Sequence, residues 1–442
     1  MTDAAVAKLQ ALVRIPTVSD RDPERVDTAA FDALHAELAD QFPLLHAHLE
    51  LTRIGSHALL FHWRGASDDR PVVLMAHLDV VPVDETAPWQ HPPFSAEIHD
   101  GAVWGRGTLD DKGCVAAICE AVEQLLADDH RPAQDLWLSF GCDEEVFGTT
   151  APAAVEELVR RGVRPWFVLD EGGAVADDAF PGVSRPVAAI GLAEKGSTSV
   201  ELRVEGRGGH ASTPAPLGPT ARLARAITRI DRRPMPAHLP DTTVELIRRL
   251  VPYLPRALRP VLDHADRIRP LLTRALTLAG PEAAAMARTT FAVTTLSGSP
   301  AINAIATSAT AGVNIRVLQG DTVDDVLEHL RQVIADDEVQ VHVVEHGEPS
   351  RVSAQGEAFD LLTSVVGELY ADAVTAPYVM TGATDSRHFT AICDHVYRFA
   401  PFRMTKAQRQ AVHSYDEHLG VEAFLAGIDW YRRLIERLPG AE

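Results

Sequence analysis

The chain has 442 residues, which is more than one ordinary hydrophobic core accommodates, so we expect at least two domains. Its formal net charge of −21 disfavours binding to nucleic acid or to anionic membranes, because the interaction with phosphate groups would be repulsive overall. This charge says little about small substrates, because a local site can carry the opposite field.

The N-terminal residues and the cysteines predict the compartment. Residues 1–5 show no basic and apolar leader pattern, and no stretch is long and apolar enough to span a bilayer. The cysteines show neither metal-type nor disulfide spacing; they are Cys114, Cys119, Cys142 and Cys393. We therefore expect reduced, mostly buried thiols in a cytoplasmic protein without a membrane or nucleic-acid partner.

Three apolar runs in the first part of the chain end at side chains that bind metals well. They are 72–76 followed by His77, 136–140 followed by Asp143, Glu144 and Glu145, and 166–169 followed by Asp170. Continuous apolar runs of this length are typical of buried parallel strands. Ligands gather beyond the carboxyl ends of such strands, so we expect one convergent polar site that holds metal.

Helical patterns alternate with these strands. One helix is expected over 114–128, opened by Asp110 and Asp111, and another around 153–161. This alternation predicts a doubly wound α/β domain whose first segment is 1–195.

A second, α+β domain is expected over 196–348. Residues 199–205 alternate strictly between apolar and charged side chains, as in a half-solvated antiparallel strand. Five further elements follow: a helix over 220–230, strands over 290–296 and 308–318, a helix capped by Asp321, and a strand over 339–344. The resulting β-α-β-β-α-β order matches a ferredoxin-like unit. An Arg- and Leu-rich insertion at 232–288 should form short helices broken at prolines, and 349–442 should return to the first domain.

Each candidate site residue also has an ordinary structural reading. His77 and Asp79 could form a satisfied structural pair, Asp110 and Asp111 a helix cap, and Asp143–Glu145 a solvated acidic loop. As a site, one carboxylate could bridge two cations, and one glutamate could ligate while its neighbour acts as general base.

Taken together, the motifs resemble metallopeptidase family 20, which includes aminoacylases, glutamate carboxypeptidases and carnosinase-like dipeptidases. They are His-Leu-Asp-Val-Val-Pro at 77–82, Gly-Arg-Gly-Thr-Leu-Asp-Asp-Lys-Gly at 105–113, Asp-Glu-Glu at 143–145, Leu-Asp-Glu-Gly-Gly at 169–173, Gly-Gly-His-Ala-Ser-Thr-Pro at 208–214 and Gly-Ala-Thr-Asp-Ser-Arg-His-Phe at 382–389. Six motifs in the family's order cover nearly the whole chain.

The resemblance implies a zinc-hydrolase catalytic domain with an inserted lid and dimerisation domain. It implies two Zn²⁺ ions per subunit, with Co²⁺ or Mn²⁺ possible. The implied ligands are His77, Asp110 and Asp170 for one ion and Asp110, Glu145 and His388 for the other, with Asp110 as the bridge. It also implies Glu144 as general base and acid, Asp79 as the support of His77, and an Asp110–Asp111 peptide that is often cis.

The same resemblance assigns substrate recognition to the inserted domain. His210 would reach the active site of a partner subunit in a homodimer and stabilise the oxyanion. Asn303 and Arg316 would bind the substrate's carboxylate or carbonyl, although they could instead cap a turn and form a surface ion pair. Gly382 is also assigned to substrate binding. Ala306 and Asn314 depart from the family's usual residues, Pro and Asp, and the insertion resembles longer-lid carboxypeptidase S-like and N-acyl-amino-acid hydrolase branches.

We therefore expect a metal-dependent hydrolase that cleaves an amide bond beside a free carboxylate in dipeptides, short peptides or N-acyl amino acids. One alternative is a dipeptidase or aminopeptidase that recognises the free amine. The other is a catalytically silent binding relative, which should have lost a ligand or the base.

Overall fold

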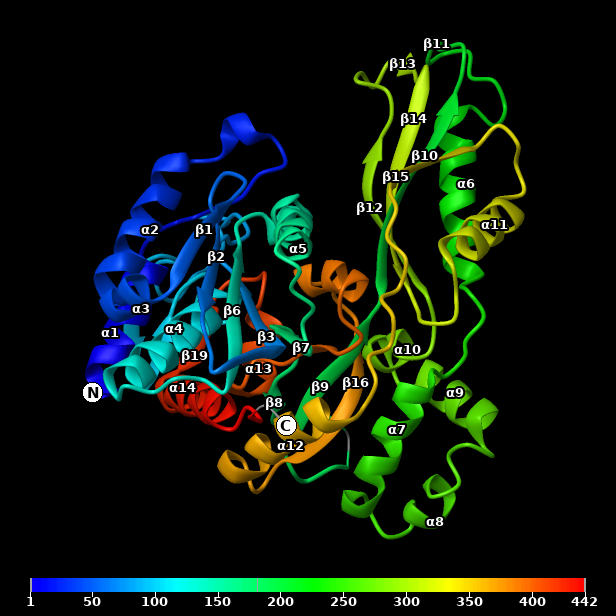
Figure 1. Cartoon of the computed structure of the whole chain (residues 1–442). Coiled ribbons are helices and arrows are strands. Elements are labelled where there is room, and N and C mark those ends of the chain that lie inside the picture. Colours follow the sequence, from blue (N-terminus) through cyan, green and yellow to red (C-terminus); the bar gives the residue numbers. More distant parts are fainter. Residues whose placement is uncertain (1, 181, 441–442) are drawn as a thin grey trace.

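Two β-sheets organise the computed structural model, which describes residues 2–180 and 182–440. A large mixed sheet carries helices on both faces, and a smaller antiparallel sheet projects away from it (Figure 1). A group of short helices lies below the smaller sheet in the same view. This arrangement confirms the predicted fold class, an α/β catalytic domain with an inserted lid.

The large sheet has ten strands, in the order β1-β2-β6-β3-β7-β17-β9-β8-β18 with β16 paired to β9. They are β1 (Glu50–Ile54), β2 (Ala58–Trp63), β3 (Ser67–His77), β6 (Gln134–Gly141), β7 (Phe167–Asp170), β8 (Val175–Ala176), β9 (Val187–Glu194), β16 (Val374–Met380), β17 (Val396–Arg398) and β18 (Arg403–Met404). Strand β3 runs parallel to both β6 and β7. The three apolar runs of the sequence are therefore adjacent central strands, and their carboxyl ends share one edge.

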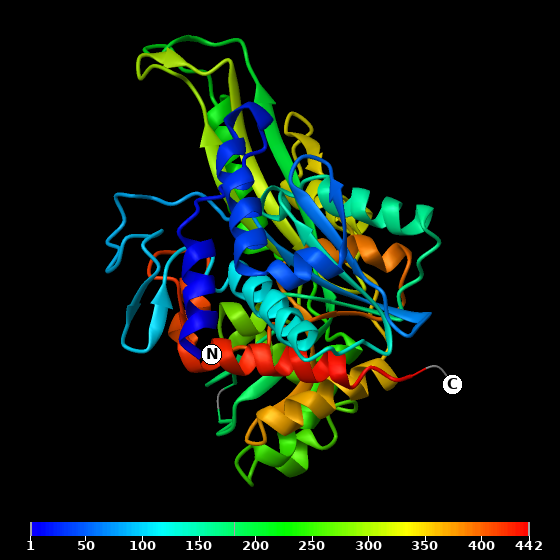
Figure 2. The same ribbon diagram turned by 60° about the vertical axis from the view of Figure 1, so that its left-hand side comes forward.

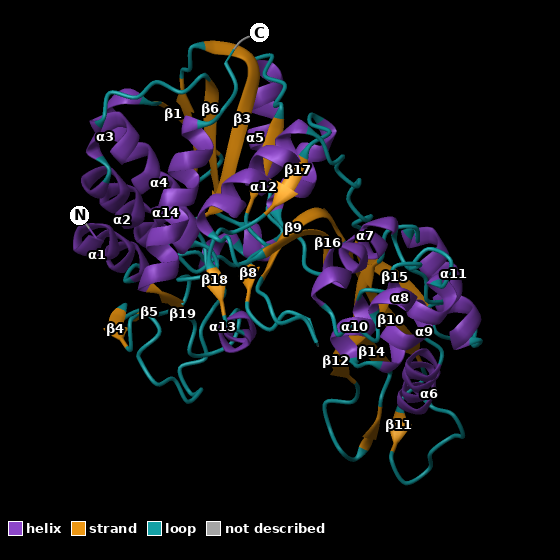
Figure 3. Cartoon of the chain, turned by 90° about the horizontal axis from the view of Figure 1, so that it is seen from below, coloured by secondary structure: helices purple, strands orange, loops and turns teal. Residues whose placement is uncertain are grey.

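Helices cover both faces of this sheet (Figures 2 and 3). One face carries α1 (Thr2–Val13), α2 (Thr28–Gln41), α3 (Pro43–His48), α4 (Lys112–Ala127) and α14 (Val421–Glu436). The other carries α5 (Thr150–Arg160), which packs against the 3₁₀ helix η4 (Asp385–Ala391). Helix α12 (Glu357–Leu369) packs against α14. Strands β4 (Glu97–His99), β5 (Ala102–Trp104) and β19 (His418–Gly420) form a small separate sheet, and α13 (Lys406–Ala411) precedes β19.

The smaller sheet has the strand order β12-β14-β10-β15, with every pair antiparallel. Its elements are β10 (Gly196–Glu205), α6 (Pro219–Arg232), β12 (Thr290–Ser297), β14 (Ser308–Val317), α11 (Val323–Ile334) and β15 (Gln340–Glu345). This is the predicted β-α-β-β-α-β order, and burial alternates along β10 as its sequence indicates. At the outer end of this lid, β11 (Gly209–His210) pairs with β13 (Ala304–Ile305).

One predicted helix cap is wrong. Helix α11 is capped by Thr322 rather than by Asp321, because the Thr322 hydroxyl accepts from the backbone N–H of Asp325 in a capping box. The Asp321 carboxylate instead accepts a hydrogen bond from the Thr289 hydroxyl, at 2.5 Å.

The insertion consists of short helices, as its prolines predict. They are α7 (Asp241–Leu250), the 3₁₀ helix η3 (Val251–Tyr253), α8 (Arg259–Leu262), α9 (Arg269–Leu278) and α10 (Pro281–Ala285). A proline stands in the first turn of α8, α9 and α10, where its missing N–H costs no helical hydrogen bond. Leu246 and Leu250 of α7 pack against Val374 and Ala376 of β16, which fixes the insertion to the large sheet. Within the described ranges, no helix combines the length and apolar character needed to cross a bilayer.

The two sheets are joined where β9 continues into β10, at residues 194–196. Glu194, the last residue of β9, forms a buried ion pair with Arg398 of β17 at 3.1 Å. Its other carboxylate oxygen accepts from the backbone N–H of Thr384 at 2.6 Å, just before η4. Glu194 therefore fixes the lid's point of attachment to two segments beside the strand ends.

Candidate active site

The carboxyl ends of the central strands carry the predicted polar residues. His77 ends β3 and lies in register with Gly141, which ends β6. Glu144 and Glu145 follow β6 in the 3₁₀ helix η2 (Glu144–Val146), and Asp170 ends β7. All four side chains are held near one edge because the strands that precede them are parallel neighbours.

The closest contacts centre on Asp110. The Nε2 atom of His77 lies 2.9 Å from Asp110 Oδ1, and the Nε2 atom of His413 lies 2.9 Å from Asp110 Oδ2. The same His413 atom is 3.0 Å from Glu145 Oε2. One potential ligand atom from each of His77, Asp110 and Glu145 lies within 4.8 Å of the others. Asp110 thus directs its two oxygens to two different groups, as a bridging carboxylate requires.

His413 therefore stands where the sequence analysis placed His388. His388 lies in η4, and its Nε2 atom is buried without a hydrogen-bond partner among the described residues. Burial and the neighbouring Arg387 lower the pKa of His388 to about 4. No described hydrogen bond or ion pair joins it to Asp110 or Glu145. The structure thus brings His413, from the C-terminal segment, to this cluster, and the assignment of His388 as a ligand stays a prediction.

Glu417, four residues after His413, was also missed by the sequence analysis. Its buried carboxylate accepts from the backbone N–H groups of Leu109 at 2.7 Å and Asp110 at 3.1 Å, and it pairs with Arg106 at 2.6 Å. It therefore holds the loop that carries Asp110. The available signal was the His413–Glu417 spacing just before the last helix, but no local pattern distinguishes it from a polar loop.

Asp79 supports both His77 and the acidic segment. The Nδ1 atom of His77 lies 3.0 Å from the backbone carbonyl oxygen of Asp79, a contact that favours the tautomer with Nε2 free. The Asp79 carboxylate accepts from the Ser19 hydroxyl at 2.7 Å and from the backbone N–H groups of Glu145 at 3.1 Å and Glu144 at 3.3 Å. The structure also contains the cis peptide between Asp110 and Asp111 that the family resemblance implied.

The site concentrates negative charge in a buried place. Burial raises the pKa of Glu144, Glu145, Asp170 and Glu171, and repulsion between neighbouring carboxylates adds to the effect for Glu144, Glu145 and Glu171. The hydrogen bonds with Asp110 and Glu145 raise the pKa of His413 to about 10. Glu145 Oε1 is buried without a hydrogen-bond partner among the described residues. Two imidazoles and several carboxylates that need positive charge are a donor set that fits divalent cations.

A pocket of about 680 Å³ opens over this cluster. Asp110, Glu144, Glu145 and His413 form part of its wall. The remaining lining includes two predicted substrate-binding residues, Arg316 and Gly382, and a group of apolar side chains: Val81, Phe147, Tyr378, Met380, Met404 and Val412. The site therefore combines polar, cationic and apolar walls.

The other two predicted recognition residues lie elsewhere. His210 and Asn303 are exposed at the outer end of the lid, where the N–H of Ala211 donates to the Asn303 carbonyl oxygen at 3.1 Å. Figure 1 shows β11 and β13, which carry this end, far from the large sheet. The structure brings His210 and Asn303 together but leaves both outside the pocket of their own chain.

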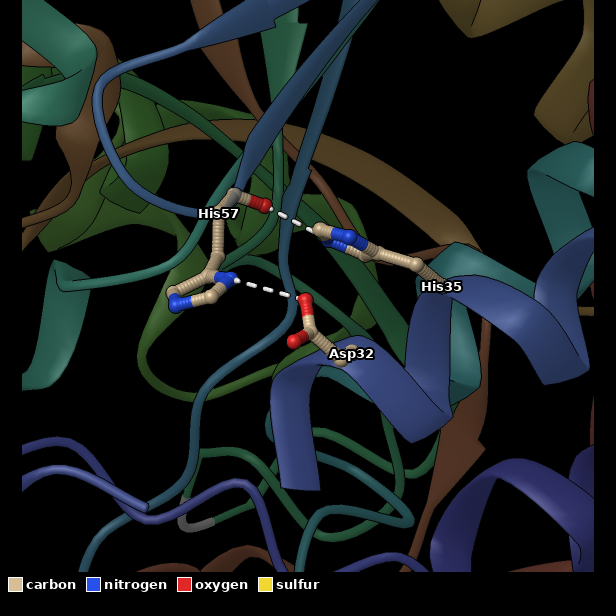
Figure 4. Close-up of side chains that lie close together, drawn as sticks. All are labelled: Asp32, His35 and His57. Atoms are coloured by element: carbon tan, nitrogen blue, oxygen red, sulfur yellow. Dashed lines mark hydrogen bonds and ion pairs between the residues drawn. The ribbon is translucent and has the colours of Figure 1, made fainter. Parts of the chain in front are cut away.

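A second group of possible ligands, Asp32, His35 and His57, lies close together near β2 (Figure 4). The Nε2 atom of His35 is 2.8 Å from the His57 carbonyl oxygen, and its Nδ1 atom accepts from Arg53 at 3.0 Å. Both His35 nitrogens are thus engaged, and a cation there would have to displace the Arg53 guanidinium. We interpret this group as a structural hydrogen-bond network.

Comparison with known proteins identifies the family. The family model described as "Peptidase family M20/M25/M40" matches residues 73–437. The chain belongs to the M20 peptidase family. This confirms the resemblance inferred from the motifs, and it makes the protein a hydrolase of a metal-dependent family.

Two curated relatives are similar over most of their length. "Probable carboxypeptidase S-like 2" of Dictyostelium discoideum is 33% identical over 416 residues, which cover 92% of this chain and 79% of the relative. The human "N-fatty-acyl-amino acid synthase/hydrolase PM20D1" is 33% identical over 436 residues, which cover 97% of this chain and 86% of the relative. Among solved structures, the M20 family metallo-carboxypeptidase Sso-CP2 from Sulfolobus solfataricus superposes with a TM-score of 0.70 at 19% identity, covering 98% of each chain.

Metal analysis of this M20 peptidase can decide whether His413 or His388 is the metal ligand. His413→Ala should lower the affinity of the site for metal by at least about tenfold, because it removes a neutral donor beside two carboxylates. His388→Ala should retain full metal content. Metal stoichiometry would be measured after dialysis against a weak chelator; full content in His413→Ala together with loss in His388→Ala would restore the original assignment.

Proposed function

We propose that the protein is a dinuclear zinc hydrolase that cleaves an amide bond beside a free carboxylate in N-acyl amino acids or short peptides. The observation that carries this proposal is the Asp110 carboxylate held between His77 and His413, next to Glu144 and Glu145. In this proposal His77, Asp110 and Asp170 hold one ion, and Asp110, Glu145 and His413 hold the other. Bound zinc would supply Lewis-acid chemistry that lowers the pKa of water and polarises a carbonyl.

Glu144 is the proposed proton carrier. It lines the pocket beside Asp110 and Glu145, and burial raises the pKa of its carboxyl group. Its backbone N–H donates to Asp79, which fixes the start of η2. In the first step its carboxylate takes a proton from the attacking water, and in the second it gives that proton to the departing amine.

Arg316 is the proposed anchor for the substrate carboxylate. It lies on β14 of the lid and lines the pocket that contains Glu144. Its Nε donates to Asn314 at 3.2 Å, and this contact orients the guanidinium along the strand. A guanidinium binds a carboxylate through two parallel hydrogen bonds, and the apolar wall of Tyr378, Met380 and Met404 suits an acyl chain or apolar side chain. The names of the two relatives, a probable carboxypeptidase S-like protein and an N-fatty-acyl-amino acid synthase/hydrolase, are consistent with such substrates.

We also propose a homodimer in which the lid's outer end completes the partner's site. The support is that His210 and Asn303 lie together but outside the pocket of their own chain. A histidine that stabilises an oxyanion must lie within hydrogen-bond distance of it.

The proposal for the compartment remains a reducing cytoplasm; the four cysteines are free thiols in the structure.

Glu144→Gln should reduce kcat by about 10²- to 10⁴-fold, because the amide keeps the side chain's shape but cannot carry a proton. Metal content should be unchanged. Glu156→Gln, at an exposed position on α5, is the matched control and should keep full activity. Turnover and metal stoichiometry would be measured for both variants; normal turnover in Glu144→Gln would contradict the mechanism.

A substrate panel tests the recognition of the carboxylate. N-acyl amino acids should be hydrolysed, and their C-terminal amides should react about 10- to 100-fold more slowly, the value of a charged hydrogen bond. Arg316→Met should lose this discrimination by slowing only the free acids. Exclusive cleavage of unblocked dipeptides would instead favour the dipeptidase alternative, and no hydrolysis by metal-loaded protein would contradict the proposed function.

Mixing two inactive variants tests the shared site. His210→Ala and Glu144→Gln should each be inactive alone, but a heterodimer has one site with both residues intact. After subunit exchange at equal concentrations, about a quarter of wild-type activity should appear, because half of the dimers are mixed and each has one working site. Mass measured by light scattering provides the oligomeric state; a monomer, or no recovery in an exchanging dimer, would contradict the proposal.

A further inference from the structure

A second pocket, of about 520 Å³, lies at the edge of the large sheet opposite the candidate active site. Its lining comes from the start of β3 and β6, the segment after β2, and the loops before β6 and after α5. Ser67, at this pocket, and His77, at the candidate metal site, are the first and last residues of β3. The two pockets therefore lie at opposite ends of the same strand, and no step of the proposed reaction uses the second one.

Four arginines from separate segments line this basic pocket: Arg64, Arg131, Arg161 and Arg164. One of them, Arg161, is already neutralised. It lies 2.7 Å from Glu50 and 2.6 Å from Glu157, and it donates to the Thr52 hydroxyl at 2.7 Å. Arg161 therefore acts as a fixed wall of the pocket.

The other three arginines have no carboxylate partner within residues 2–180 and 182–440. Arg131 donates to the Gly65 carbonyl oxygen, which fixes its guanidinium at the rim. Arg64 and Arg164 are exposed, and no described hydrogen bond or ion pair uses their side chains. An unpaired group of like charges is unfavourable, and it is conspicuous in a chain whose net charge is −21.

The acidic residues of the pocket do not balance this charge. Glu50 is paired with Arg161. Asp135 accepts from His62 at 2.7 Å and from the Gly65 N–H at 2.8 Å. Asp68 is exposed and, among the pocket's described residues, is the remaining acid. With Glu50 set against Arg161, the three other arginines face two negative charges, Asp68 and the hydrogen-bonded Asp135, in a concave site.

The aromatic floor of the pocket limits the kind of ligand. The Trp137 indole stacks on His62 with ring centroids 4.0 Å apart, and the Arg161 guanidinium lies 5.5 Å from its centre. Trp137 is only 2% exposed, so it offers no open ring face on which a nucleobase could stack. The recognition elements that remain are guanidinium groups, which bind phosphate and carboxylate oxygens in pairs.

We propose that this basic pocket binds a small multivalent oxyanion, of the phosphate or the polycarboxylate type, through Arg64, Arg131 and Arg164. The ligand would neutralise the three arginines and connect the loops at the amino ends of β3 and β6. Binding to the folded chain alone would also stabilise it by mass action. This inference does not depend on the proposed hydrolysis.

Calorimetric titration of the metal-loaded protein tests the proposal. The probes are inorganic phosphate and tricarballylate, which distinguish the two ligand types, with monovalent acetate as a control. At least one probe should bind with one site per chain, and its affinity should fall as NaCl is added. Arg64→Gln/Arg164→Gln should weaken binding by at least about tenfold and should leave hydrolysis unchanged, because both residues are exposed and lie at the opposite edge of the sheet.

The matched control is Arg256→Gln/Arg351→Gln, which removes the same charge from two exposed arginines outside the pocket. This variant should bind the probe as tightly as the wild type. Three results would overturn the proposal: no binding of either multivalent anion, unchanged binding in Arg64→Gln/Arg164→Gln, or equal weakening in both double variants. Thermal unfolding with and without the probe verifies that each variant is folded.

Discussion

The repulsion among carboxylates buried at the strand ends is the constraint on which the rest of the site depends. Glu144, Glu145 and Glu171 are placed near Asp110 by strands that cannot move apart without breaking the central sheet. Burial and mutual repulsion raise the pKa of Glu144, Glu145 and Glu171, so their charged forms need positive partners. Divalent cations would supply that charge, with the imidazoles of His77 and His413, which contact Asp110, as neutral donors.

The buried carboxylates around the site position the backbone of the neighbouring loops through hydrogen bonds. Asp79 accepts from the N–H groups of Glu144 and Glu145, and Glu417 accepts from those of Leu109 and Asp110. Each buried carboxylate therefore fixes the backbone of a loop that carries acids of the site. Glu194 performs the same function at the lid's attachment, because it binds Arg398 and the N–H of Thr384 together.

The sequence predicted those parts of the molecule that local patterns determine. Unbroken apolar runs identified β3, β6 and β7, because a strand that is buried on both faces is apolar throughout. Strict alternation identified β10, because a strand that is buried on one face alternates apolar and polar residues. His413 belongs to no such local pattern, because it precedes β19 in an irregular segment. Its contact with Asp110 joins positions about 300 apart in the chain. His388 attracted the assignment because its motif is distinctive, yet the structure places it in η4 beside Arg387, and no described hydrogen bond or ion pair joins it to Asp110 or Glu145. The prediction of the N-cap of α11 was wrong for a simpler reason: Asp321 and Thr322 are both good cap residues, and only the backbone geometry decides between them.

The division between the two domains separates stability from selectivity. The proposed ligands and Glu144 all belong to the large-sheet domain, whose strands, helices and buried ion pairs hold them in place. Arg316 reaches the same pocket from β14, so the proposed anchor for the substrate carboxylate belongs to the lid, while His210 and Asn303 lie at the lid's far end. A change of lid position would therefore alter the distance between this proposed anchor and the acids without disturbing the acids themselves. For this reason substitutions on β14 should change substrate choice more readily than they change the ability to hold metal, and substitutions at the strand ends should do the reverse.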